Sequence, residues 1–163
     1  MFVLVRALTF ASLFVALVLV LVPARVLEWS GISSPSALGA PQLAGLAIVI
    51  VGGGVAIWCV LAFATLGRGT PAPFDPPRLL VVRGPYRFVR NPMYLGASAA
   101  LAGAALYYQS PSLLAYLAIF ALAMHLFVVW YEEPTLTRAF GDEYAAYRAR
   151  VRRWLPNWRA RSE

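Results

Sequence analysis

The chain has 163 residues, enough for one domain, and 61% of them are hydrophobic. Its mean hydropathy of +0.69 and its long apolar runs exclude an ordinary soluble globule. The basic residues are all arginine and give a net charge of +7, a value that a nucleic-acid-binding protein or a membrane protein with arginine-rich cytosolic ends can have. With one cysteine, Cys59, and one histidine, His125, we expect no disulfide framework and no metal site.

A bilayer core takes about 20 apolar residues per helix. Four segments reach or approach that length, and we expect each to span a membrane: 2–22, 42–66, 92–109 and 111–131. The first resembles a signal peptide, but its basic end holds only Arg6 and no convincing cleavage site follows. We therefore expect it to be retained as a helix.

The last two segments are separated by almost nothing and predict a tight antiparallel hairpin. Asn91-Pro92 and Ser110-Pro111 each have the pattern of a helix N-cap followed by proline in the first turn. Small residues recur every four positions in the third segment and favour close helix packing, and Gly52-Gly53-Gly54 in the second segment can serve the same purpose or allow a bend. The repeating residues are Gly96, Ala100 and Ala104.

Arginine is concentrated in the loop 67–92 and after Tyr131, whereas the loop between the first two segments holds only Arg25 and Glu28. By the positive-inside rule, both termini and the arginine-rich loop face the cytosol. A prokaryotic plasma membrane suits this topology. Because the arginines follow a bilayer boundary, we expect no nucleic-acid partner.

An amphipathic stripe follows the fourth segment, with polar arginines mostly off it. It predicts a helix lying on the cytosolic leaflet with Trp154 and Trp158 as interface anchors, although the same helix could also cover a site. The stripe residues are Leu136, Phe140, Tyr144, Tyr147, Val151 and Trp154.

The hairpin brings the start of the third segment and the end of the fourth to one membrane face. Arginines 83, 87 and 90, tyrosines 86 and 94, and Glu132 and Glu133 then share one cytosolic patch. Two interpretations remain open. The charges can be ion pairs that orient the hairpin, or they can bind a ligand with anionic, aromatic and cationic parts, such as S-adenosylmethionine or another nucleotide.

Two further features each allow two interpretations. His125, inside the fourth segment, is either an intramembrane functional group or a neutral histidine bonded across helices. The proline-rich stretch 67–78 is either a plain connector or a preorganised loop beside a site.

Two motif blocks, GPYRFVRNPMY at 84–94 and YEEPTLTRAFGDEYAAYRARV at 131–151, stand on either side of the hairpin. In order and spacing, residues 65–156 resemble the isoprenylcysteine carboxyl methyltransferase and phospholipid methyltransferase superfamily of integral-membrane enzymes. The resemblance implies an all-α membrane fold of about four transmembrane helices, in one domain: two variable helices in 1–66, then a cofactor-binding loop, a helical hairpin and a C-terminal amphipathic helix in 67–163.

The resemblance also implies the site. Arg90, Glu132 and Glu133 are the implied catalytic residues. The implied cofactor-binding residues are Arg78, Leu79, Leu80, Val81, Tyr86, Asn91, Pro92, Met93, Tyr94 and Glu132. The cofactor would be S-adenosylmethionine, with S-adenosylhomocysteine as product, and the acceptor a lipophilic small molecule or lipid that enters from the bilayer.

Two positions depart from the superfamily pattern. Asn91 stands where the family has histidine, and asparagine can hydrogen bond but cannot accept a proton near pH 7. Val128 stands where prenylcysteine-methylating members have a substrate-contacting arginine, which argues against a prenylcysteine carboxylate as acceptor. The alternatives to a methyltransferase are a four-helix module that binds anionic lipid or a partner protein, and a nicotinamide-dependent membrane reductase.

Overall fold

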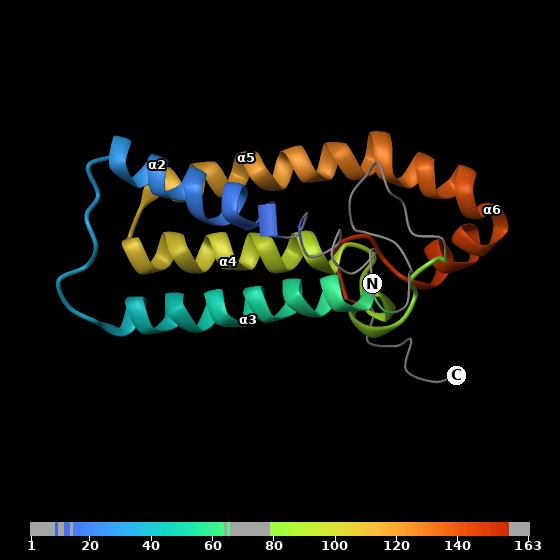
Figure 1. Cartoon of the computed structure of the whole chain (residues 1–163), viewed down its shortest axis with the longest axis horizontal. Helices are drawn as coiled ribbons and strands as arrows, with labels where there is room; N and C mark the ends of the chain where they lie inside the picture. Colours follow the sequence, from blue (N-terminus) through green and yellow to red (C-terminus); the bar gives the residue numbers. More distant parts are fainter. Residues whose placement is uncertain (1–8, 10–11, 14, 64, 66–78, 157–163) are drawn as a thin grey trace.

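The computed structural model describes residues 9, 12–13, 15–63, 65 and 79–156, which form helices joined by turns and loops, with no strand among them. Figure 1 shows α3, α4 and α5 side by side, with α2 over α4 and α5, and α6 beyond the far end of α5. In chain order the elements are η1 (Val15–Leu21, π-helical), α2 (Val22–Trp29), α3 (Ala40–Ala62), η3 (Gly84–Arg87, a 3-10 turn), α4 (Pro92–Tyr108), α5 (Pro111–Phe127), η4 (Val128–Glu132, π-helical) and α6 (Glu133–Arg150).

Helices α3 and α4 form the most extensive interface, and it depends on glycine. A Cβ atom added to Gly52 would lie 2.5 Å from the carbonyl oxygen of Gly96, and one added to Gly45 would lie 2.6 Å from that of Gly103. The two backbones therefore touch at two points, seven residues apart on each helix. The small-residue packing expected from the sequence is confirmed for Gly52 and Gly96, whereas nothing lies within 4 Å of a Cβ added at Gly53.

Helices α4 and α5 form a hairpin. Gln109 ends α4 in the left-handed conformation, with φ of 51°. Ser110 then caps α5, because its hydroxyl accepts a hydrogen bond from the backbone N–H of Leu113 at 3.2 Å. Ala97 and Leu101 of α4 pack against Phe120 of α5, and the hairpin closes around these buried side chains.

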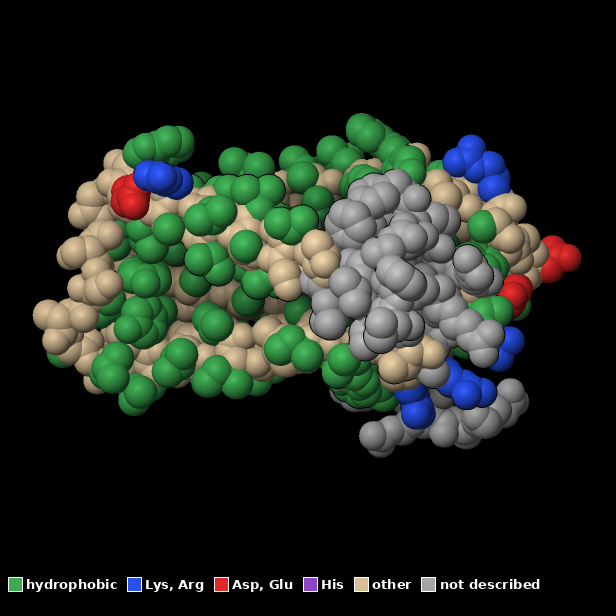
Figure 2. Space-filling model, viewed as in Figure 1, with side chains coloured by type: hydrophobic (Ala, Val, Ile, Leu, Met, Phe, Trp, Pro, Cys, Tyr) green, Lys and Arg blue, Asp and Glu red, His purple; other side chains and the backbone are tan. Residues whose placement is uncertain are grey.

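Two helices in the described part of the chain are long and apolar enough to cross a membrane: Ala40–Ala62, and the continuous run Pro111–Arg150 that includes α5. Only 17% of the apolar window of α3 is buried, so most of its side chains face outward. Gly141 interrupts this run, and its uninterrupted part, 111–140, is about 45 Å long, which exceeds a bilayer core, so only its apolar first part fits within one. Figure 2 shows hydrophobic side chains along the helices and charged ones at the two ends.

The count of four spans is not confirmed. Helix α4 has 17 residues, and only part of the first expected segment lies in the described residues. Its end also differs, because η1 and α2 continue past Val22 to Trp29. Pro23 lies inside this continuous helical run, where the π-helical η1 passes into α2. Arg25 and Glu28, expected in a loop, form an ion pair of 2.9 Å on α2.

The C-terminal region differs from a helix that lies on lipid. Gly141, with φ of 46°, interrupts α6, and the chain after Arg150 continues as residues 151–156, which we call the C-terminal strap. Tyr144, Tyr147 and Val151 of the predicted stripe are buried and pack with Leu80, so protein covers the stripe. Trp158 lies outside the described residues.

Candidate functional site

A small pocket, partly open to solvent, lies where η3, the start of α4 and η4 meet the end of α3. Its cavity volume of about 20 Å³ holds roughly one water molecule. Ligand pockets usually enclose about 300–1,000 Å³, so a nucleotide-sized ligand requires this pocket to open widely. It is lined by Phe63, Tyr86, Arg90, Asn91, Met93, Tyr94 and Glu132. Six of these seven belong to the residues that the sequence assigned to cofactor binding or catalysis.

Tyr86 is buried and lines the pocket on the side of η3. Its ring stands edge-on to Phe63, with centroids 5.2 Å apart, and it packs with Cys59 and Val81. The hydroxyl of Tyr147 donates a 2.7 Å hydrogen bond to the carbonyl oxygen of Tyr86. Burial raises the pKa of Tyr86 well above its ordinary value, so this phenol stays neutral.

Glu132 and Tyr94 face each other across the hairpin. The Tyr94 hydroxyl donates to Glu132 Oε2 at 3.1 Å, which confirms that the start of α4 and the end of η4 meet. Glu132 is the last residue of the π-helical segment, a local distortion that is frequent at functional sites. In the described part of the chain, no arginine is paired with this carboxylate, so its negative charge remains available to a ligand.

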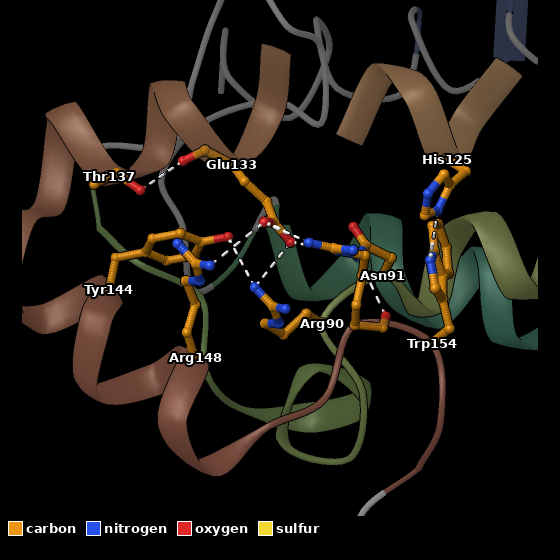
Figure 3. A network of polar contacts seen from close by, with 9 residues as sticks. Arg90, Asn91, His125, Glu133, Thr137, Tyr144, Arg148 and Trp154 are labelled. Atoms are coloured by element: carbon orange, nitrogen blue, oxygen red, sulfur yellow. Dashed lines mark hydrogen bonds and ion pairs between the residues drawn. The ribbon is translucent and has the colours of Figure 1, made fainter. Parts of the chain in front are cut away.

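Glu133 has the opposite surroundings, because arginines enclose its carboxylate (Figure 3). Arg90 Nη1 lies 2.9 Å from Glu133 Oε1, and Arg153 donates from Nε and Nη2 at 2.7 and 2.9 Å. The more distant Arg148 lies at 3.9 Å. The hydrogen bond to Glu133 raises the pKa of Arg153 above its ordinary value, so the guanidinium stays charged.

Arg90 connects this ion-pair cluster with the pocket. Its side chain is 10% exposed, and its Nη1 also lies 3.4 Å from the hydroxyl of Tyr144. The Nε of Arg90 is buried and has no hydrogen-bond partner. A buried donor without an acceptor costs free energy. A ligand in the pocket could supply that acceptor.

The C-terminal strap passes beside the start of α4. The backbone N–H of Arg90 donates to the carbonyl of Arg152 at 2.9 Å, and Asn91 Nδ2 donates to the carbonyl of Arg153 at 3.3 Å. Asn91 stands at the N-cap position of α4, but its side chain makes no capping bond and is used for the strap. Further along, Trp154 Nε1 donates to His125 Nδ1 at 3.1 Å, so His125 is bonded to the strap.

The other predicted site residues lie around the pocket. Leu80 and Val81 belong to the buried clusters behind it, and Leu79 is 52% exposed. Pro92 is the buried first residue of α4. Glu133 is outside the pocket lining, and Arg78 lies outside the described residues. The arginines at 83 and 87 are exposed and, unlike Arg90, do not belong to the pocket lining.

Sequence reasoning missed Phe63 and Arg153. Phe63 follows an apolar helix whose other residues give no sign that its end borders a pocket. Arg153 is one of several arginines near the C-terminus, and no local pattern marks it as the one that makes paired hydrogen bonds to Glu133.

Comparison with known proteins identifies the family. Residues 41–143, well over half of the chain, match the family model described as phospholipid methyltransferase. A curated relative, Methanethiol S-methyltransferase 1 of Bradyrhizobium diazoefficiens, is 34% identical over 95 residues, which are 56% of this chain and 29% of that protein. The chain thus spans less than a third of that relative, and no solved structure matches it significantly. The match from α3 into α6, with both motif blocks around the pocket, shows that the chain belongs to the phospholipid methyltransferase family.

Proposed function

We propose that the protein is an S-adenosylmethionine-dependent methyltransferase, an integral-membrane enzyme whose acceptor is a lipophilic small molecule or lipid. Membership of the family and the apolar helices support this proposal. One observation carries it: two complementary groups line the same pocket. One is Arg90, which is buried and has a donor without a partner. The other is the Glu132 carboxylate, which no described arginine neutralises.

The donor set fits S-adenosylmethionine. This ligand has a carboxylate, an ammonium group, a ribose diol, an adenine and a sulfonium. Arg90 can donate to an anionic oxygen, and Glu132 can accept from the ammonium or the ribose hydroxyls. Phe63, Tyr86 and Tyr94 offer aromatic faces for adenine or for a cation.

When bound, S-adenosylmethionine supplies an activated methyl group for an in-line displacement. The protein then has to orient the acceptor and exclude water. The neutral phenol of Tyr86 and the partly buried ring of Phe63, which stands edge-on to it, give the pocket an aromatic wall. Tyr94 orients the Glu132 carboxylate through its hydroxyl, and Glu132 is the group of the pocket that can take a proton from an acceptor.

Among acceptor classes, a thiol or an amine suits the site better than a carboxylate. Val128 is 1% exposed and apolar, so it offers no charge to an acceptor carboxylate. The curated relative is named for methylation at sulfur, and a thiol must lose its proton, a task that Glu132 can perform. A small thiol is therefore the first acceptor to test, followed by lipid amines.

The test is calorimetric titration of S-adenosylhomocysteine into detergent-purified protein. Wild type is expected to bind, and both Glu132→Gln and Tyr94→Phe are expected to weaken binding at least tenfold, about 1.4 kcal/mol. Tyr107→Phe is the matched control, because Tyr107 belongs to the same helix but lies near its other end, against Tyr108. It should bind like wild type.

A folded wild type that does not bind the product would overturn the proposal. Lipid attraction alone gives no reason to bind it, so the lipid-binding module would then become the better hypothesis. A parallel titration with a reduced nicotinamide cofactor distinguishes the reductase, which would bind that cofactor and not S-adenosylhomocysteine.

A further inference from the structure

The C-terminal strap contacts both walls of the pocket. One wall is the start of α4, where Arg90 and Asn91 line the pocket and donate to the carbonyls of Arg152 and Arg153. The other wall is the junction of η4 and α6, where Glu132 lines the pocket and Glu133 binds the strap. Both sets of strap contacts thus fall on pocket residues or on their immediate neighbours.

The single residue Arg153 contacts both walls, Asn91 on one and Glu133 on the other. Its carbonyl accepts from Asn91 Nδ2 at 3.3 Å, while its guanidinium holds both carboxylate oxygens of Glu133 at 2.7 and 2.9 Å. The carboxylate it holds is also bound by Arg90, 2.9 Å away, whose side chain lines the pocket. The position of Arg153 therefore influences Asn91 directly and Arg90 through Glu133.

We propose that Arg153 is a positioning residue of the site: it fixes the start of α4 against the η4–α6 junction and so sets where Arg90 and Asn91 stand in the pocket. It does not line the pocket in the described structure, so it acts through these residues and not on a ligand. Its two parallel bonds to Glu133 are a geometry that a planar guanidinium makes and an ammonium does not.

The chain offers a matched control in the same strap. Arg152 is adjacent, carries the same charge and has an exposed side chain. Its contact with Arg90 uses the backbone carbonyl, which a side-chain substitution retains. Arg153→Met and Arg152→Met therefore change net charge equally, but only the first removes the contact with Glu133. Because Arg90 and Arg148 still face Glu133, the Arg153 variants are expected to fold.

The first readout is amide hydrogen exchange of the intact protein in detergent, without ligand. Arg153→Met should accelerate exchange in the peptide 89–96, about 60 positions away in the chain, at least threefold, while Arg152→Met leaves it at the wild-type rate. Arg153→Lys keeps the charge and loses the paired bonds, so it should fall between the two. Unchanged exchange at 89–96 in Arg153→Met would overturn the proposal.

The second readout rests on the proposed function. The dissociation constant for S-adenosylhomocysteine should rise at least tenfold in Arg153→Met and less than twofold in Arg152→Met. If wild type binds and Arg153→Met binds equally well, the positioning role is wrong although the methyltransferase proposal stands. If wild type does not bind but exchange at 89–96 still responds, the proposed function is wrong and the link made by Arg153 stands.

Discussion

Glu132 and Glu133 are adjacent in the chain, yet their carboxylates have opposite roles in the structure. Glu132 faces the pocket with the Tyr94 hydroxyl, whereas Glu133 is 7% exposed and faces three arginines. Removing one partner of a buried ion pair leaves the other charges without compensation, at a cost of about 3 kcal/mol. We therefore expect Glu133→Gln to lower the thermal unfolding midpoint in detergent clearly. The same isosteric substitution at the next position, Glu132→Gln, should leave the midpoint nearly unchanged.

The control for this prediction is built into the pair, because both substitutions remove one negative charge at neighbouring positions. A general effect of charge would shift both midpoints alike. Equal midpoints for the two variants would contradict the assignment of Glu133 to the fold and of Glu132 to the pocket. The predicted catalytic role of Glu133 is accordingly replaced by a structural one in our proposal.

At the scale of the helices, the contact of α3 with α4 places Phe63 beside the pocket, and Gly52 sets how closely these helices approach. A Cβ at Gly52 would lie 2.5 Å from the Gly96 oxygen, so Gly52→Ala must push the helices apart. We expect a loss of about 1–3 kcal/mol of stability, the usual cost of overpacking, and weaker product binding. Gly53→Ala meets nothing within 4 Å and should be neutral or slightly stabilising. Thermal unfolding of the two variants measures the difference; a neutral Gly52→Ala would contradict the close packing.

Local signals in the sequence were enough to predict several elements. The Ser110-Pro111 pattern gave the start of α5, and the glycine and alanine spacing gave the α4 face that meets α3. The motif blocks gave most of the pocket lining, including Tyr86 and Glu132. In contrast, the strap contacts join residues about 20 to 60 positions apart, such as Arg153 with Glu133 and Asn91. Such pairings depend on the tertiary fold, which hydrophobic periodicity does not encode.

At the scale of the whole molecule, charge separates the two ends of the apolar helices. Figure 2 shows one acidic and basic pair at the α2 end and the remaining charged side chains at the α6 end. Among the described residues, the α2 end holds Arg25 and Glu28 as an ion pair. The other described arginines belong to the region of η3, α4 and α6. By the positive-inside rule, we expect the pocket end to face the cytosol and the loop between α2 and α3 to face outward.

Cysteine labelling in intact cells tests this orientation, because the single native cysteine, Cys59, is 0% exposed and should give no background. Ser34 lies exposed between α2 and α3, and Asp142 lies exposed in α6 beside the kink at Gly141. A membrane-impermeant maleimide should label Ser34→Cys in intact cells, and it should label Asp142→Cys only after the membrane is permeabilised. The reverse pattern would place the pocket outside the cell, where S-adenosylmethionine made in the cytosol could not reach it without transport. Labelling of both sites in intact cells would instead indicate that the apolar helices do not hold the chain across the bilayer.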